Sequence, residues 1–268
     1  MASWLGRLSP RRRIFAAAVT ALLAAAVVVA VVSVVVANQD SAAGQPAGYP
    51  AQDRPGPVLL VPGYGGNTNS LTILARRIRA TGRQATVLHL PGNGTGSLVG
   101  DASVLNAAVS HALRGGAPSV DVIGYSAGGV ATLLWAREDG GAHKARRIVT
   151  LGAPFHGAQL AADGEAFLPN ACPPACRQLV PGSSLLSQLA AGITAHRPSW
   201  LSLWSIDDKT VDPPDSARLA GAVNVPIQSV CPAQQISHSQ LPTSPAVTAM
   251  VLQAIGTGPV QPTPADCG

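Results

Sequence analysis

The chain has 268 residues, of which 47% are hydrophobic and 12% are charged, so it is long and apolar enough for a catalytic domain and too poor in charge for a disordered body. The net charge of +5 comes from 18 basic and 13 acidic residues, but four of the basic residues, Arg7 and Arg11–Arg13, precede the first apolar run. The remaining 14 basic residues nearly balance the 13 acidic ones and form no basic stripe, which excludes a nucleic-acid-binding protein.

The first element along the chain is an apolar segment. Ile14–Ala37 contains 24 residues without a charge. As a helix it would be about 36 Å long, more than the roughly 30 Å hydrocarbon core of a bilayer. Since a cleavable signal peptide has an apolar region of only about 7–15 residues, we expect residues 1–37 to be a basic cytoplasmic stub and an uncleaved transmembrane anchor, with the rest of the chain outside the cytoplasmic membrane. The alternative is a long signal peptide cleaved near Ala37, which would leave a secreted protein.

The rest of the chain divides into a linker, one domain and a tail. Residues 38–56 are polar, contain Pro and Gly and lack an apolar period, which indicates a flexible linker. We expect a catalytic domain over residues 57–258 and a Pro-containing tail over residues 259–268.

Helices and strands alternate along the predicted domain. Short apolar runs predict strands at 58–61, 85–90, 120–123, 147–151, 200–204 and 224–228. Apolar, helix-forming segments predict helices at 71–80, from Asp101 or Ser103 to Arg114, and at 130–137 and 243–255, whereas residues 158–194 are expected to be irregular. This alternation predicts an α/β fold with a mostly parallel, doubly wound sheet of about six strands and helices on both faces.

A Gly-x-Ser-x-Gly motif follows the third predicted strand. Gly124, Ser126 and Gly128 lie between that strand and a predicted helix, which is the strand–turn–helix context of a nucleophile elbow. Such a turn projects the serine hydroxyl away from the sheet, and the glycines remove side chains that would collide with the neighbouring strand and helix. The motif therefore predicts Ser126 as a nucleophile. The alternative is an ordinary serine in a tight strand–helix connection.

Backbone N–H groups near this serine are candidates for stabilising an oxyanion. The helix that follows Ser126 offers its free N-terminal N–H groups, and the glycine-rich turn Pro62–Gly66 follows the first strand, where a second donor is usual. We expect the N–H groups of Ala127 and Tyr64 to form this oxyanion hole. A plain strand–helix turn is the alternative for Pro62–Gly66.

The chain order Ser, then acid, then His is usual after such an elbow. Asp207 and Asp208 follow the fifth strand directly, and Asp212 and Asp215 come slightly later. Among six histidines, only His238 lies after the last strand and before the last helix. His89 and His196 are out of order, His111 and His143 fit surface positions, and His156 fits either the rim of the site or a solvated position.

The sequence resembles actinobacterial extracellular lipases and esterases of the small α/β-hydrolase, lipase class 2 type. The matching stretches are Val61–Gly65, Gly124–Gly129, Leu151–Gly157, Trp204–Leu219 and Ser237–Pro242, which anchor most of residues 57–255 and leave residues 1–56 uncovered. Many family members have histidine where this chain has Pro62, but the expected oxyanion donor is a backbone N–H.

The resemblance implies an α/β-hydrolase fold and hydrolysis of carboxylic esters, with acyl esters or lipids as substrates. It implies Ser126 as nucleophile, His238 as base and Asp208, rather than Asp207, as the acid. We expect no cofactor and no metal, and a monomer that meets the membrane through residues 14–37. An inactive membrane-tethered binding module on the same fold and an acyltransferase with the same triad are the alternatives.

Four cysteines in an exported domain indicate two disulfides, for which three connectivities are possible. Cys172 and Cys176 are close enough in sequence for a local bridge. Cys231 with Cys267 would then tie the tail to the connection that carries His238. A metal site is the alternative, but no histidine lies at ligand spacing near Cys172 or Cys176.

Overall fold

The computed structural model describes residues 48–193 and 198–267, and the chain from Tyr49 onward forms one compact unit. The predicted anchor, residues 14–37, lies outside the described residues. Within the described ranges, no helix combines the length and the apolar character needed to cross a membrane.

A six-stranded parallel sheet forms the centre of this unit. Its strands follow the order β2-β1-β3-β4-β5-β6, and each neighbouring pair is parallel. The bounds are β1 (Val58–Val61), β2 (Ala85–Val87), β3 (Val120–Tyr125), β4 (Ala145–Leu151), β5 (Ser199–Trp204) and β6 (Val223–Pro226). The observed order and direction confirm the predicted parallel, doubly wound sheet.

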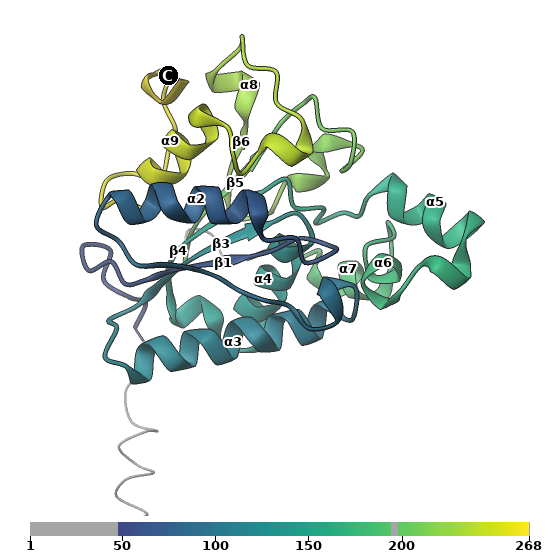
Figure 1. Ribbon diagram of the computed structural model, residues 1–268, viewed down its shortest axis with the longest axis horizontal. Coiled ribbons are helices and arrows are strands. Elements are labelled where there is room, and N and C mark those ends of the chain that lie inside the picture. Colours follow the sequence, from purple (N-terminus) through teal and green to yellow (C-terminus); the bar gives the residue numbers. More distant parts are fainter. Residues whose placement is uncertain (1–47, 194–197, 268) are drawn as a thin grey trace, which may run out of the picture. The chain divides into compact units, whose positions relative to one another are not determined.

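Helices cover both faces of the sheet, as predicted. Figure 1 shows α2 (Asn69–Ala80) and α9 (Pro245–Ala254) on one face and α3 (Leu98–Arg114) and α4 (Ala127–Glu138) on the other. Successive strand residues alternate between the two cores: Leu60 packs with the α2 and α9 side chains, whereas Leu59 and Val61 pack with those of α3 and α4. A parallel sheet that is buried on both faces explains why the strands read as continuous apolar runs.

Shorter elements occupy the connections. The α-helices are α5 (Gln159–Phe167), α6 (Pro174–Gln178), α7 (Ser184–Leu189) and α8 (Ile227–Val230). The 3-10 helices are η2 (Pro91–Gly94), η3 (Gly141–His143), η4 (Pro169–Ala171), η5 (Pro214–Ala217), η6 (His238–Gln240) and η7 (Pro264–Cys267). The expectation of irregular structure over 158–194 was therefore wrong for α5, α6 and α7. The helix α5 buries none of its residues, so its sequence carries no apolar period.

Several element boundaries differ from those expected. The helix α3 begins at Leu98, earlier than Asp101, because the Ser97 hydroxyl caps it by accepting from the Val99 N–H. The strand β2 ends at Val87, although the Leu88 N–H still donates to the Leu60 carbonyl over 2.9 Å. Pro62, which follows β1, has no N–H with which to continue the ladder. The last strand ends at Pro226, and the chain turns directly into α8.

Polar contacts join residues outside the predicted domain to this unit. The Gln52 side chain, in the predicted linker, donates to the Arg146 carbonyl over 3.1 Å and accepts from Arg147 Nε over 3.2 Å. A disulfide joins Cys231 to Cys267 in the predicted tail. Residues 49–56 and 259–267 therefore belong to the same compact unit as the sheet. Their hydrogen bonds and disulfide carry no apolar period in the sequence, although Val260 also packs against the core.

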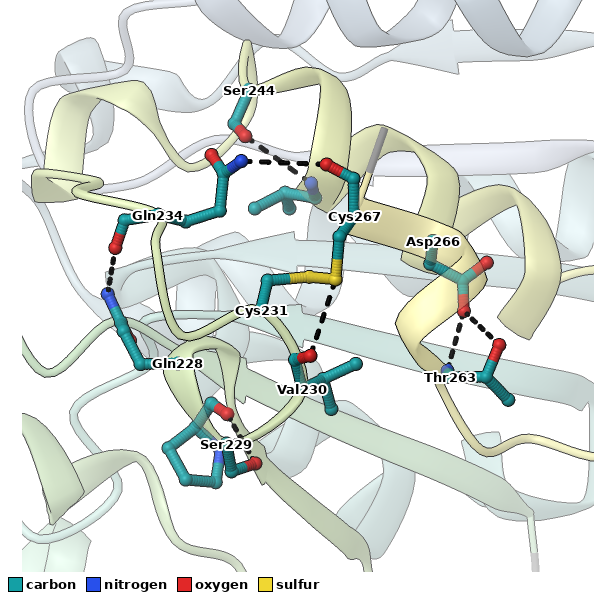
Figure 2. The surroundings of a disulfide bond; sticks show 11 residues. Gln228, Ser229, Val230, Cys231, Gln234, Ser244, Thr263, Asp266 and Cys267 are labelled. Carbon is teal, nitrogen blue, oxygen red and sulfur yellow. Dashed lines mark hydrogen bonds between the residues drawn. A yellow bond between two sulfur atoms is a disulfide. The ribbon is translucent and has the colours of Figure 1, made fainter.

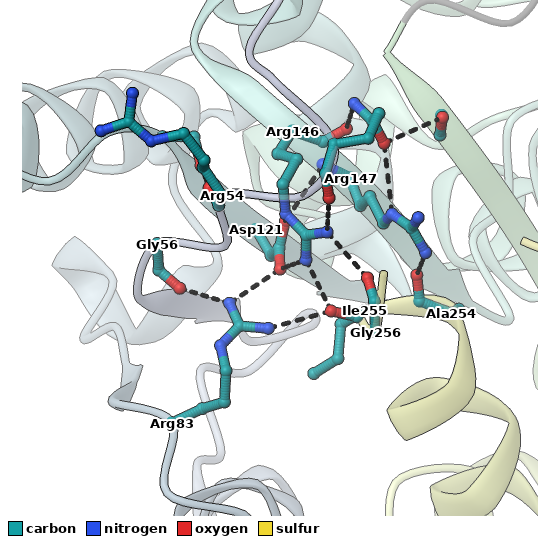
Figure 3. A network of polar contacts seen from close by, with 12 residues as sticks. Arg54, Gly56, Arg83, Asp121, Arg146, Arg147, Ala254, Ile255 and Gly256 are labelled. Atoms are coloured by element: carbon teal, nitrogen blue, oxygen red, sulfur yellow. Dashed lines mark hydrogen bonds and ion pairs between the residues drawn. The ribbon is translucent and has the colours of Figure 1, made fainter. Parts of the chain in front are cut away.

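A buried cluster of charges lies where β3 and β4 begin. Figure 3 shows the carboxylate of Asp121 between the guanidinium groups of Arg83 and Arg146. Arg146 is fully buried, and its guanidinium lies 2.5 Å from Asp121. It also donates to the carbonyls of Ile255 and Gly256, just after α9. This cluster attaches the C-terminal end of α9 to the sheet. It lies at the amino ends of the strands, opposite their carboxyl ends.

Candidate active site

Ser126 stands on a sharp turn between β3 and α4. Its backbone has φ 53° and ψ −128°, a left-handed conformation that is rare for a residue with a side chain. A Cβ at Gly124 would lie 2.7 Å from the Gly129 Cα, and one at Gly128 would overlap the carbonyls of Val61 and Pro62. Glycine at both positions therefore lets the turn pack against β1 and α4, as a nucleophile elbow requires.

Three polar side chains from separate connections meet at this turn. Ser126 Oγ lies 2.9 Å from His238 Nε2, and His238 Nδ1 lies 2.6 Å from Asp208 Oδ2. His238 is 7% exposed and Asp208 is 1% exposed, so both groups are largely shielded from water. The geometry allows His238 to accept the serine proton while the carboxylate faces its other ring nitrogen.

Asp208 is held by its own turn. Its second carboxylate oxygen, Oδ1, accepts from the N–H groups of Thr210 and Val211 over 2.8 and 2.9 Å. Oδ2 is thereby directed at His238. The neighbouring Asp207 contacts Gln228 Nε2 over 3.1 Å instead. Asp212 and Asp215 are exposed.

Tyr125 and Gly152 surround the histidine. The Tyr125 hydroxyl donates to the His238 carbonyl over 3.2 Å, and the two rings lie 5.1 Å apart. Burial, followed by the charge of Asp208, raises the pKa of Tyr125 to about 12, so this hydroxyl keeps its proton. A Cβ on Gly152, which has φ 56°, would lie 3.1 Å from His238 Nδ1 and 3.2 Å from Asp208 Oδ2.

Neither residue is predicted from the sequence as part of the site. Tyr125 is a variable position of the elbow motif, and Gly152 lies in Leu151–Gly157, one of the stretches that carry the family resemblance. The position of Gly152 directly after a strand was the one available signal.

The other histidines lie elsewhere or outside the described residues. His89, His111, His143 and His156 are exposed, and His196 is not among the described residues. The backbone N–H of His156 donates to the Ser216 carbonyl over 3.3 Å. His238 is the histidine that the described structure brings to Ser126.

The two expected oxyanion donors flank the serine. A Cβ on Gly63 would lie 2.9 Å from the Ser126 Cβ, so the turn that bears Tyr64 passes directly beside the serine. Ala127 is the first residue of α4, and its N–H therefore has no acceptor within the helix. The role of these two N–H groups stays a prediction.

A pocket of about 270 Å³ opens beside Ser126. Most of its lining is apolar and comes from α5, α6 and the turns around them: Ala158, Leu160, Ala161, Gly164, Ala171, Cys176, Leu179 and Val211. Leu160, Phe167 and Leu168, from α5 and the residue after it, are 62–79% exposed next to this pocket. The pocket can hold an apolar group whose polar end reaches the serine.

All four cysteines lie in the described part of the chain and are paired as Cys172–Cys176 and Cys231–Cys267. No cysteine thiolate is therefore left there as a metal ligand. The described residues also contain no group of three or more His, Cys, Asp or Glu that could hold a metal ion.

Comparisons with known proteins concern the fold. No protein-family model matches the sequence, and no curated protein matches it. The structure is similar to that of Aspergillus fumigatus lipase B, with a TM-score of 0.64 and 19% identity over 81% of this chain. A mature lipase of Bacillus licheniformis matches with a TM-score of 0.54 and 18% identity, covering 68% of this chain and 86% of that one. An α/β hydrolase enzyme from a lagoon-sediment metagenome matches with a TM-score of 0.53 and 15% identity, covering 74% and 89%.

The chain has the α/β-hydrolase fold. It spans 56% of the length of the Aspergillus lipase. In the α/β-hydrolase sheet observed here, Ser126 follows β3, Asp208 follows β5 and His238 follows β6, at the carboxyl ends of the strands. The strand order reverses between β1 and β3, and at such a switch point the ends of parallel strands open a crevice for a ligand.

Proposed function

We propose that the protein is a serine hydrolase of carboxylic esters, with Ser126 as nucleophile, His238 as general base and acid, and Asp208 as the group that orients His238. The observation that carries the proposal is the continuous contact from Ser126 Oγ through His238 to Asp208, at 2.9 and 2.6 Å. A buried carboxylate that orients a histidine, which in turn contacts a serine, is the arrangement that activates a serine hydroxyl.

In the proposed reaction, Ser126 Oγ attacks the ester carbonyl carbon while His238 Nε2 takes the hydroxyl proton. The N–H groups of Tyr64 and Ala127 donate to the oxyanion of the tetrahedral intermediate. Collapse of that intermediate breaks the bond to the alcohol, which leaves with the proton from His238. Water then attacks the acyl-enzyme with His238 again as base, which releases the acid and restores Ser126.

The proposed substrates are esters of aliphatic acyl chains. Support comes from the pocket beside Ser126, which has a volume of about 270 Å³ and a mostly apolar lining, as a binding site for an acyl chain requires. Burying methylene groups against an apolar wall favours binding by about 0.8 kcal/mol each.

The proposed location is outside the cytoplasmic membrane, with residues 14–37 as anchor, residues 38–56 as linker and a monomeric catalytic domain. Two disulfides support an oxidising compartment. The relation to actinobacterial lipases of the class 2 type rests on the sequence stretches named for it. Mass spectrometry of the native N-terminus distinguishes the anchor, which retains residues 1–37, from a secreted form that begins near Asn38.

The decisive experiment measures hydrolysis of p-nitrophenyl butyrate by the full-length protein in detergent. We expect the wild type to turn over this ester and Ser126→Ala to abolish turnover while the circular dichroism spectrum is unchanged. Turnover that survives Ser126→Ala would overturn the proposal, as would a folded wild type that hydrolyses no ester in a series of acyl lengths.

A matched pair of variants tests the acid in the same assay. Asp208→Asn should lower kcat by about 10⁴, because the amide would favour the wrong histidine tautomer. Asp207→Asn, one position earlier, should keep kcat within about tenfold, since Asp207 contacts Gln228 and not His238. The reverse ranking would assign the role to Asp207.

A further inference from the structure

Gln228 makes an unusual number of contacts for one amide side chain. It lies in the short helix α8 and is half-buried. Its Oε1 accepts from the Ile206 N–H over 3.1 Å. Its Nε2 lies 2.9 Å from Ser205 Oγ, 3.1 Å from Asp207 Oδ2 and 3.2 Å from the Gln234 carbonyl. Both ends of the amide are therefore occupied by protein groups.

These partners belong to two separate connections, and each carries a member of the proposed triad. Ser205 to Asp207 form the turn after β5 that leads directly into Asp208. Gln234 lies after α8, four positions before His238. Figure 2 shows Gln228 reaching the Gln234 carbonyl beside the Cys231–Cys267 disulfide, with the Gln234 side chain directed at the Cys267 carbonyl. One side chain thus links the turn of the acid to the loop of the base.

The turn from Ser205 to Asp207 is stabilised by the same groups that hydrogen-bond to Gln228. The Asp207 N–H donates to Ser205 Oγ over 3.1 Å, and the Asp208 N–H donates to the Ser205 carbonyl over 3.2 Å. Ser205 is fully buried, so its hydroxyl has no access to water in place of Gln228. Loss of the amide would leave this buried hydroxyl one partner short and would free Ile206 and Asp207.

We propose that Gln228 is a positioning residue that keeps Asp208 and His238 aligned by fastening their two connections to each other. The proposal rests on the proposed function, because it assumes that the Asp208–His238 contact serves catalysis. Gln228 touches neither Ser126 nor the pocket beside it. Its effect passes through the 2.6 Å contact between Asp208 and His238, which a shift of either connection would lengthen.

Glutamine suits this place because the position needs both a donor and an acceptor. Glutamate has the same length but no N–H, and its charge would face Asp207. Methionine has similar length and neither donor nor acceptor. These two substitutions therefore remove the link in different ways, and glutamate still offers an oxygen to the Ile206 N–H.

The test compares Gln228→Met and Gln228→Glu with wild type in the full-length protein, using p-nitrophenyl butyrate. We expect kcat to fall at least tenfold in both variants, with KM within about threefold and an unchanged circular dichroism spectrum at the assay temperature. Ser229→Ala is the matched control, since the hydroxyl of this exposed neighbour in α8 donates to the Pro226 carbonyl and not to the turn before Asp208 or to Gln234. Its kcat should equal that of wild type.

A double-mutant cycle separates positioning from general support of the fold. In the Asp208→Asn background, where the acid no longer orients His238, Gln228→Met should lower the residual kcat less than twofold. An equal loss in both backgrounds would overturn the proposal. So would a lower melting temperature with unchanged kcat in either Gln228 variant. Absence of any Ser126-dependent turnover in the wild type would instead refute the proposed hydrolase activity.

Discussion

At the scale of single residues, Asp101 is a buried carboxyl group that the proposed reaction does not use. It lies in the first turn of α3 and is 2% exposed. Its Oδ1 has no hydrogen-bond partner among the described residues. Burial raises the pKa of Asp101 from its usual 3.8 to about 6, because the charged form is poorly solvated there.

This raised pKa predicts a pH-dependent stability. Because the folded state binds the proton more tightly than the unfolded state, Asp101 destabilises the fold increasingly as pH rises from about 4 to about 6. Asp101→Asn removes the charge, so the free energy of unfolding should rise by about 2 kcal/mol at pH 7.5 and change little at pH 4. Urea unfolding followed by circular dichroism measures both values.

Asp121→Asn is the control for this prediction, since Asp121 is also buried but contacts the guanidinium groups of Arg83 and Arg146. It should lower the free energy of unfolding at pH 7.5. A gain for Asp101→Asn that is equal at both pH values would contradict the assignment of the effect to the charge.

The candidate triad could be predicted from the sequence because its members are constrained by chain order. Ser126 carries a local motif, and His238 is the histidine in the right interval. The choice between Asp207 and Asp208 came from the resemblance, since both follow β5 within four residues. Gln228 and Gly152 were missed, because the contacts that define them join segments far apart in the sequence.

At the scale of elements, a single disulfide joins the connection before His238 to the end of the chain. Cys231 and Cys267 are separated by 36 positions, and α9 lies between them. Cys172 and Cys176, by contrast, are separated by four positions, and Cys176 lines the pocket beside Ser126. The two bridges differ in loop length, so their removal should have different consequences.

Removing the Cys231–Cys267 disulfide should lower both the stability of the fold and the rate of catalysis. Cys231→Ser with Cys267→Ser should lower the free energy of unfolding by up to about 4 kcal/mol, against about 2 kcal/mol for the Cys172 and Cys176 pair, because a longer loop gains more freedom in the unfolded chain. The first double variant should also lose turnover at temperatures where circular dichroism still shows a folded domain. Equal midpoints in thermal unfolding for the two double variants would contradict this account.

The elements that the sequence could predict are the strands of the sheet and the helices that pack against its two faces. Apolar runs located all six strands, because strands packed between two layers of helices are mostly apolar, although Asp121 in β3 and Arg146 in β4 are buried polar exceptions. The helix α5 escaped prediction because none of its residues is buried. It forms part of the wall of the pocket, so the specificity of the proposed site depends partly on a helix that the sequence did not predict.

At the scale of the whole folded unit, the domain predicted from apolar patterning, residues 57–258, is shorter at both ends than the compact unit that the structure shows. The predicted boundary at position 57 excludes Gln52, whose carbonyl accepts from Arg146 over 2.8 Å. The predicted boundary at 258 excludes Cys267, which is bonded to Cys231. Hydrogen bonds and disulfides between distant segments leave no periodic signal, so the sequence alone could predict the sheet but not the segments fastened around it.

Arg146 connects β4 to three other segments, and its replacement should test whether the connection is structural alone. Its guanidinium contacts Asp121 in β3, the Gln52 carbonyl in the N-terminal segment and the carbonyls of Ile255 and Gly256 after α9 (Figure 3). Arg146→Met removes a buried cation from these acceptors, of which Asp121 and the Ile255 carbonyl keep only Arg83 as a guanidinium partner, and should lower the free energy of unfolding by about 3–5 kcal/mol.

The same variant should keep kcat/KM per folded molecule within about twofold at low temperature, because Arg146 lies where β4 begins and Ser126 follows the opposite end of β3. Unfolding in urea, followed by the fluorescence of the buried Trp135 and Trp200, measures the first value, and ester hydrolysis in the same samples measures the second. Arg76→Met, an exposed arginine on α2, is the matched control and should change the free energy of unfolding by less than about 0.5 kcal/mol. A loss of kcat in folded Arg146→Met would show instead that the two ends of the sheet are coupled, through α9 and the loop that carries His238.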